Sequence, residues 1–140
     1  MLDRLHKLYT QNKTTAYKDI WLHQKKEKTT LINFLYFANI VKNKIPASHK
    51  TIEQKTYYHN ITTGDFLFPD GIALQAFYTL AYLLGYLAHK KIPNLNGTDF
   101  VPYFLQKCKD DKKKIRIHLY GASPDTVTVA AAYFKQYASI

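Results

Sequence analysis

Residues 71–88 (GIALQAFYTLAYLLGYLA) form a stretch of the chain without a charged side chain. As a helix this stretch would measure about 27 Å, which is close to the shortest length that spans a lipid bilayer. Gln75, Thr79 and two glycines dilute its apolar character, and both flanks belong to an alternation of strands and helices. We therefore expect a buried helix, and a helix in contact with a membrane surface or a true membrane span are the alternatives.

Strands and helices alternate along most of the chain. β-branched and aromatic residues predict a buried strand over 29–37 (TTLINFLYF) and a short strand over 65–68 (DFLF), and 115–120 (IRIHLY) alternates as a third strand should. This order predicts an α/β fold with a small, mostly parallel, Rossmann-like sheet and flanking helices. The expected helices lie within the first thirty residues and over 38–44, 71–88, 98–109 and 125–137.

Capping residues predict where two of these helices begin. Ser123 is a typical N-cap residue, and Pro124 after it suits the first helical position. Thr98 is placed to cap the helix that follows the turn at 93–97.

Near the N-terminus, helical spacing predicts one apolar stripe. This stripe consists of Leu2, Leu5, Leu8 and Tyr9.

The length and charge of the chain limit its organisation and its partners. With 140 residues we expect a single α/β domain, in which 1–28 form a polar helical extension of a main body over 29–140. Twenty Lys and Arg against ten Asp and Glu give a net charge of +10, which attracts nucleic acid, anionic lipid headgroups or diphosphates. Cys108 is the single cysteine and no secretory signal opens the sequence, so we expect a cytoplasmic location.

The sequence offers little support for a metal, a cofactor or a nucleic acid as partner. The six histidines do not have the spacing of metal ligands, so we expect neither a metal nor a cofactor. The basic charge and the many tyrosines would suit a nucleic-acid-binding module, but neither an RNA-binding aromatic motif nor a helix-turn-helix is found. That class, and a small membrane-associated protein built on 71–88, remain the alternatives to an enzyme.

Candidate chemistry lies where the expected strands end, because open α/β sheets bind their ligands beyond the carboxyl ends of the strands. Asp70 follows the second strand between a proline and a glycine, a rigid and approachable position that suits a general base. The alternative is a turn aspartate that caps the next helix. The turn at 120–124 (YGASP) is typical of a phosphate-binding helix start, although it lacks a dinucleotide fingerprint and a P-loop.

Three segments in order, 68–72 (FPDGI), 94–100 (NLNGTDF) and 118–124 (HLYGASP), resemble the first half of a known family. It is the WecG/TagA/CpsF family of bacterial glycosyltransferases, of the N-acetylmannosaminyltransferase type. The family has a Pro-Asp-Gly after a strand, a Gly-Ser/Thr-Asp helix start, and a Leu-Leu-Gly-Gly-x-Pro-Gly turn before an Ala-rich helix. The resemblance covers residues 65–138, with the Ala-rich helix at 129–133.

The resemblance implies transfer of an N-acetylmannosamine-like N-acetylhexosamine from a UDP-sugar to a polyprenyl-diphosphate-linked acceptor. The reaction would serve cell-surface polysaccharide synthesis, invert the anomeric centre and use no bound metal. It would take place in the cytoplasm at the inner face of the membrane, with the anionic membrane surface as a further partner. Asp70 matches the family's proposed base. The positions that match substrate-binding motifs are Asn39, Asn94, Asn96, Gly97, Thr98 and Asp99. The positions that match the nucleotide-binding turn are Gly121, Ala122, Ser123 and Pro124.

The chain also departs from the family pattern. The family's Thr-x-Asn motif is not preserved, since either Phe34 and Tyr36 or Phe37 and Asn39 would occupy it. Asn94 stands where an arginine is usual. Ala122 and Asp125 replace glycines of the third motif, and the Pro-Lys-Gln-Glu segment of the family's second half is missing. We therefore expect an incomplete chain that self-associates or takes a second polypeptide as partner, and the alternative is an inactive product. The apolar surface expected for this contact consists of Leu119, Val127, Val129 and Phe134.

Overall fold

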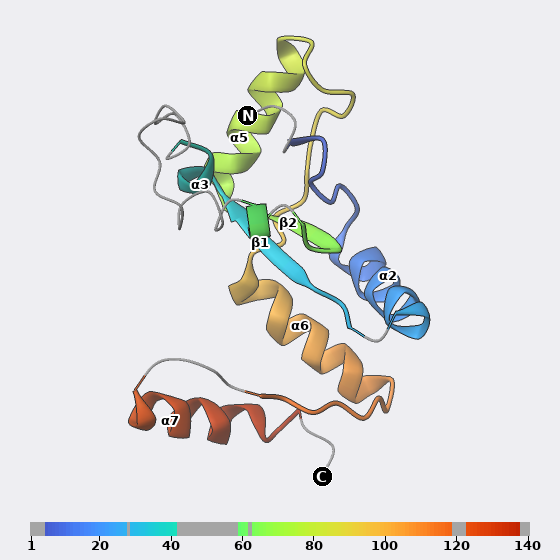
Figure 1. Ribbon diagram of the computed structural model, residues 1–140, viewed down its shortest axis with the longest axis vertical. Helices are drawn as coiled ribbons and strands as arrows, with labels where there is room; N and C mark the ends of the chain where they lie inside the picture. Colours follow the sequence, from blue (N-terminus) through green and yellow to red (C-terminus); the bar gives the residue numbers. More distant parts are fainter. Residues whose placement is uncertain (1–4, 28, 42–58, 62, 119–122, 138–140) are drawn as a thin grey trace. The chain divides into compact units, whose positions relative to one another are not determined.

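The structure is a computed structural model that describes residues 5–27, 29–41, 59–61, 63–118 and 123–137 (Figure 1). The chain divides into two compact units, Met1–Gly97 and Thr98–Ile140. Helices and a small parallel sheet give the chain the mixed α/β character that the sequence predicts. The single domain and its extension over 1–28 stay predictions.

The first unit contains a two-stranded parallel sheet. Its strands are β1 (Ile32–Tyr36) and β2 (Phe66–Asp70), drawn as neighbouring arrows in Figure 1. In their register Ile32 lies opposite Phe66 and Tyr36 lies opposite Asp70. Both strands were expected, but β2 continues through Pro69 to Asp70, two residues beyond the predicted end. The helices of this unit whose bounds lie within the described residues include α2 (Lys13–Lys26), α3 (Phe37–Val41) and α5 (Ile72–Leu83).

The N-terminal segment lies along the other edge of β2. Leu8 forms a parallel bridge with Leu67, and the Tyr9 backbone N–H donates to the Leu67 carbonyl at 2.9 Å. The predicted helical stripe through Leu8 is therefore wrong, because the backbone here pairs with a strand. The helix begins only at Lys13, after Asn12, whose side-chain oxygen accepts hydrogen bonds from two N–H groups of the first turn.

The core of the first unit lies between the N-terminal segment, the sheet and α5. Leu5, which is helical, and Leu8, which forms the bridge to Leu67, are both buried. Helix α5 contributes its inner face, and the segment after it contributes Leu87 and Ile92. The buried residues of this cluster are Leu5, Leu8, Leu35, Leu67, Leu74, Tyr78, Ala81, Leu87 and Ile92.

The apolar stretch at 71–88 forms a helix of only twelve residues, Ile72–Leu83. It ends in a Schellman motif, in which Tyr86 N–H donates to Ala81 at 3.0 Å and Gly85 N–H donates to Tyr82 at 2.9 Å. Gly85 has φ +79°, the left-handed conformation that this motif needs. Within the described parts of the chain, no helix has both the length and the apolar character to cross a membrane. The prediction of one helix over 71–88 was too long, because Gly85 stops it.

The described part of the second unit contains two helices, α6 (Gly97–Asp110) and α7 (Pro124–Phe134). Helix α6 starts on the last residue of the first unit. The predicted N-cap of α7 is confirmed, since Ser123 Oγ accepts from the Thr126 N–H at 3.4 Å. The strand expected over 115–120 is not found in its described part, because residues 115–118 have no strand partner. Residues 119–120 lie outside the described residues, so the described sheet has two strands and not three.

The apolar surface expected on the C-terminal helix is found in part. Val129 is 71% exposed, and none of the residues of α7 is buried. Val127 and Phe134 are only partly exposed, and Leu119 lies outside the described residues. Self-association through this surface stays a prediction.

Candidate functional site

Asp70 is the last residue of β2, at the carboxyl end of the parallel strand pair. Its side chain is half-buried, and none of the described residues donates a hydrogen bond to its carboxylate. The alternative role, a turn aspartate that caps the next helix, is wrong. Gly71 occupies the N-cap position of α5, and no side chain caps that helix. The carboxylate therefore has no structural role in starting α5, and a strand holds its backbone in place.

Gly71 makes the sharp change of direction from β2 into α5. Its φ of +89° and ψ of 153° belong to a backbone region that residues other than glycine rarely adopt. A Cβ at this position would meet no atom within 4 Å, so the backbone conformation and not the space requires glycine. The Gly71 N–H donates to Asn94 Oδ1 at 3.0 Å. The turn after Asp70 is thus held by a residue from the second predicted motif.

The loop at 94–97 is fixed to the end of β2 by a second hydrogen bond. The Leu95 N–H donates to the Pro69 carbonyl at 2.9 Å, and the Leu95 side chain is buried. Gly97 lies near the Phe34 ring of β1, where an added Cβ would stand 3.8 Å away, an ordinary contact distance. The loop that carries Asn94, Asn96 and Gly97 therefore lies at the same sheet end as Asp70.

Asn39 follows β1 and lies in α3, at the carboxyl end of the neighbouring strand. It is 2% exposed, and its Oδ1 accepts from the Tyr36 N–H at 3.2 Å. Tyr36 lies directly opposite Asp70 in the strand register. Three predicted site residues that are far apart in the sequence, Asn39, Asp70 and Asn94, thus belong to one end of the sheet. Asn39 is a supporting residue here, because its side chain holds the turn from β1 into α3.

The remaining predicted site residues belong to the second unit or lie outside the described residues. Thr98 and Asp99 lie in the first turn of α6, and Thr98 is not the predicted N-cap because the helix already begins at Gly97. Ser123 and Pro124 open α7. Gly121 and Ala122 lie outside the described residues. The nucleotide-binding role of this turn stays a prediction.

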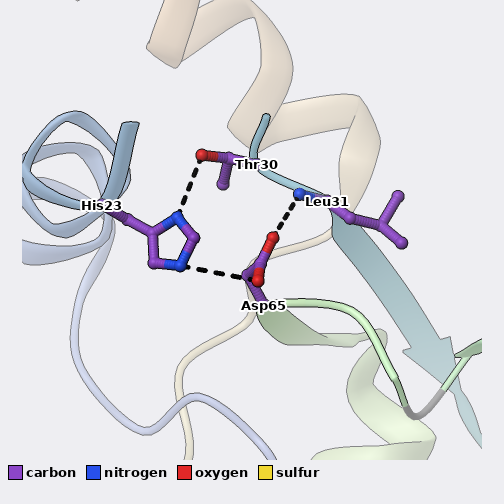
Figure 2. Close-up of polar contacts among 4 residues, drawn as sticks. All are labelled: His23, Thr30, Leu31 and Asp65. Carbon is purple, nitrogen blue, oxygen red and sulfur yellow. Dashed lines mark hydrogen bonds and ion pairs between the residues drawn. The ribbon is translucent and has the colours of Figure 1, made fainter. Parts of the chain in front are cut away.

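A polar cluster at the opposite, amino end of the strands was not predicted from the sequence (Figure 2). His23 Nε2 lies 3.5 Å from Asp65 Oδ1, and His23 Nδ1 lies 3.2 Å from Thr30 Oγ1. Asp65 Oδ2 accepts from the Leu31 N–H at 2.7 Å. His23 also lies in the last turn of α2, where a helix favours positive charge. The cluster joins α2 to the starts of both strands, so we assign it a structural role.

Among the cavities lined by described residues are two open ones in the first unit, and Asp70 lines neither of these two. One, of about 470 Å³, lies at the amino end of β2, and the other, of about 290 Å³, lies along α5. The first is lined by Lys7, Thr63, Gly64, Asp65 and Leu67. The second is lined by Ile72, Gln75, Ala76, Thr79, Lys91 and Ile92. In the described ranges, no group of three or more His, Cys, Asp or Glu side chains is arranged to hold a metal ion.

Comparison of the chain with models of protein families, with curated proteins and with solved structures gives no match. The resemblance to the WecG/TagA/CpsF family therefore rests on the three short segments of the sequence.

Proposed function

We propose that this chain is a glycosyltransferase that moves an N-acetylmannosamine-like N-acetylhexosamine from a UDP-sugar to a polyprenyl-diphosphate-linked acceptor. The observation that supports the proposal is the position of Asp70. This carboxylate ends a parallel strand, does not cap the next helix, and is followed by a turn that Asn94 holds. Such a strand end is where α/β folds of the Rossmann-like kind bind their ligands.

The transfer needs one base and a site for the leaving diphosphate. The acceptor hydroxyl attacks the anomeric carbon of the donor sugar, and its proton passes to the Asp70 carboxylate. The new carbon–oxygen bond forms as the bond from the anomeric carbon to the UDP oxygen breaks, and the anomeric centre inverts. The released UDP carries the negative charge away, and the net charge of +10 favours the binding of such a polyanion.

Asn94 gives the site a second polar group. Its Oδ1 accepts a hydrogen bond from the Gly71 N–H. Its side-chain amide nitrogen can therefore donate to a hydroxyl or acetamido oxygen of a bound sugar. Asn39 supports the site through the backbone, because its Oδ1 accepts a hydrogen bond from the N–H of Tyr36, which lies opposite Asp70. In this proposal Asp70 is the catalytic residue, Asn94 binds substrate and Asn39 is a positioning residue.

A transfer assay with the purified full chain tests the proposal. The donor is UDP-N-acetylmannosamine, the acceptor is a polyprenyl-diphosphate-linked sugar, and the extended lipid-linked product is measured by chromatography. We expect Asp70→Asn to lower the transfer rate by about 10²- to 10⁴-fold, the usual contribution of a general base.

The matched control is Asp65→Asn, which changes the aspartate just before the amino end of β2. This variant should keep the wild-type rate, because Asp65 lies at the other end of the strand pair. The proposal fails if the wild type transfers no sugar, if Asp70→Asn is as fast as the wild type, or if both variants lose the same activity.

A further inference from the structure

Helix α5 is apolar on two opposite faces, of which only one is covered in the described residues. The inner face packs Leu74, Tyr78 and Ala81 into the core. The other side of its C-terminal end is exposed. Because a helix that is apolar all round is normally buried or in contact with lipid, this exposed side needs an explanation.

The exposed side chains form a surface that we call the α5-end patch. Leu80 is 52% exposed, Leu83 68%, Leu84 62% and Tyr86 54%. The three leucines have the spacing i, i+3 and i+4, which places them on one face of the helix. The Schellman motif at Gly85 fixes the turn that carries Tyr86. The patch is therefore a defined surface and not a frayed helix end.

Two lysines lie beside α5, in a segment that a hydrogen bond from the helix holds at Ile92. The Gln75 side chain donates to the Ile92 carbonyl at 2.9 Å. The Lys90 carbonyl lies 3.4 Å from the Thr79 hydroxyl, whose shorter hydrogen bond of 2.9 Å goes to the Gln75 carbonyl within the helix. Lys90 and Lys91 therefore lie next to the turn of α5 that leads into the patch, and both are exposed.

No acidic residue balances these lysines nearby in the sequence, because none occurs between Asp70 and Asp99. The surface combines exposed leucines, a tyrosine and two lysines in a stretch of sequence that has no acidic residue. This is the composition of a segment that lies in the interface of an anionic bilayer. Tyrosine suits that depth because its ring is apolar and its hydroxyl remains hydrated.

We infer that the α5-end patch and Lys90–Lys91 bind the surface of an anionic lipid bilayer. The leucines enter the boundary between headgroups and acyl chains, and the lysines bind the lipid phosphates. The twelve residues of α5 measure about 18 Å, so the helix lies in the interface and does not span the bilayer. This inference does not depend on the transfer reaction, because it concerns lipid and not the sugar donor.

Vesicle co-sedimentation with the full chain tests the inference. One set of vesicles is phosphatidylcholine alone, and the other is an equal mixture of phosphatidylcholine and phosphatidylglycerol. We expect binding to the mixed vesicles and little binding to phosphatidylcholine alone. The triple variant Leu80→Ser, Leu83→Ser, Leu84→Ser should weaken binding by at least about tenfold. Lys90→Ser with Lys91→Ser should weaken it by about thirtyfold, since each lysine near an anionic surface contributes about 1 kcal/mol.

Two control variants separate this surface from the general basic charge of the chain. Lys25→Ser with Lys26→Ser removes the same charge from an exposed pair on α2, and Val129→Ser removes an exposed apolar side chain from α7. Both controls should bind within about twofold of the wild type. The free energy of unfolding of each variant in urea tests whether the changes leave the fold intact.

Three results would overturn the inference. The wild type could fail to bind the mixed vesicles, or the leucine variant could bind as the wild type does. The two lysine pairs could also weaken binding equally, which would mean that net charge alone is responsible.

A fourth outcome decides against lipid in favour of a second copy of the chain. In that case sedimentation equilibrium shows an oligomer that the leucine variant abolishes, while no vesicle binding is found.

Discussion

The backbone N–H of Gly71 donates a hydrogen bond to Asn94 Oδ1 at 3.0 Å. This contact joins two of the three sequence segments that resemble glycosyltransferase motifs, and it lies directly after Asp70 at the carboxyl end of β2. Because Gly71 has an unusual backbone conformation, the hydrogen bond and the glycine together set the direction in which the chain leaves the strand.

Gly71→Ala should destabilise the protein by about 1–3 kcal/mol, because alanine is strained at φ +89°. The strain is purely in the backbone, since the added Cβ meets no atom within 4 Å. The free energy of unfolding in urea measures the effect. Gly97→Ala is the matched control, because its Cβ would make an ordinary 3.8 Å contact with the Phe34 ring. Equal losses in the two variants would contradict the role that we give to the Gly71 conformation.

Asn94→Ala should release the Gly71 N–H. The change removes one hydrogen bond and should lower the free energy of unfolding by about 1 kcal/mol or less, since the bond is exposed. A more direct readout is hydrogen exchange of the Gly71 amide, which we expect to be faster in Asn94→Ala than in the wild type. Asn94→Asp keeps an oxygen acceptor and should restore the protection. An exchange rate that is the same in all three proteins would show that the contact does not persist in solution.

Asp65 should contribute to stability mainly through the hydrogen bond that its carboxylate accepts from the Leu31 N–H. Asp65→Ala should lower the free energy of unfolding by about 1 kcal/mol. Asp65→Asn keeps an acceptor and should cost a few tenths of a kcal/mol, because ion pairs as exposed as His23–Asp65 are weak. A double-mutant cycle with His23→Gln should give a coupling below about 1 kcal/mol that declines with added salt. A coupling above about 2 kcal/mol would mean that the ion pair, and not the hydrogen bond, dominates.

Tyr9 should make the protein less stable at alkaline pH. Burial, and then the hydrogen bond to Asp19 and the charge of Asp19, raise the pKa of the Tyr9 phenol above its ordinary value. The unfolded chain ionises this phenol near pH 10, before the folded protein does, so the stability that Tyr9 contributes is complete below about pH 10. It declines as the pH rises towards the higher pKa of the folded state.

The variant Tyr9→Phe tests this dependence. Near neutral pH it loses the 2.5 Å hydrogen bond to Asp19 and should be less stable than the wild type by about 1 kcal/mol. The difference between the two proteins should stay constant up to about pH 9 and shrink as the pH rises from about 10 to about 12. Tyr86→Phe, at an exposed tyrosine, is the control for removal of a phenol. A difference that stays constant or grows above about pH 10 would be inconsistent with a raised pKa of Tyr9.

The sequence predicted best those elements whose signals are local. Runs of β-branched and aromatic residues located β1 and β2, and Ser123 with Pro124 located the start of α7. Alternation over 115–118, the described part of the third expected strand, was misleading, because a strand also needs a partner that periodicity cannot supply. Leu8 was misassigned for the converse reason, since its partner is Leu67, far along the chain.

For the candidate site, residue types and strand ends were enough to select Asp70, but they could not show its partners. The contact between Gly71 and Asn94 and the register of Tyr36 against Asp70 depend on pairing across the fold. The cluster of His23 and Asp65 was missed for the same reason, because two residues so far apart in sequence carry no local signal. The exposed side of α5 was missed because apolar composition alone predicted burial.

A titration of the isotope-labelled full chain with UDP-N-acetylmannosamine, followed by amide chemical shifts, tests the central claim most directly. It measures whether the carboxyl end of β1 and β2 binds the sugar donor, whatever the transfer rate. We predict saturable shift changes at Gly71, Asn94 and Asn39, with Leu31 at the amino end unchanged, and weaker binding in Asn94→Ala. Shift changes confined to the amino end of the strands, or none at high donor concentration, would contradict the assignment of this sheet end as the donor site.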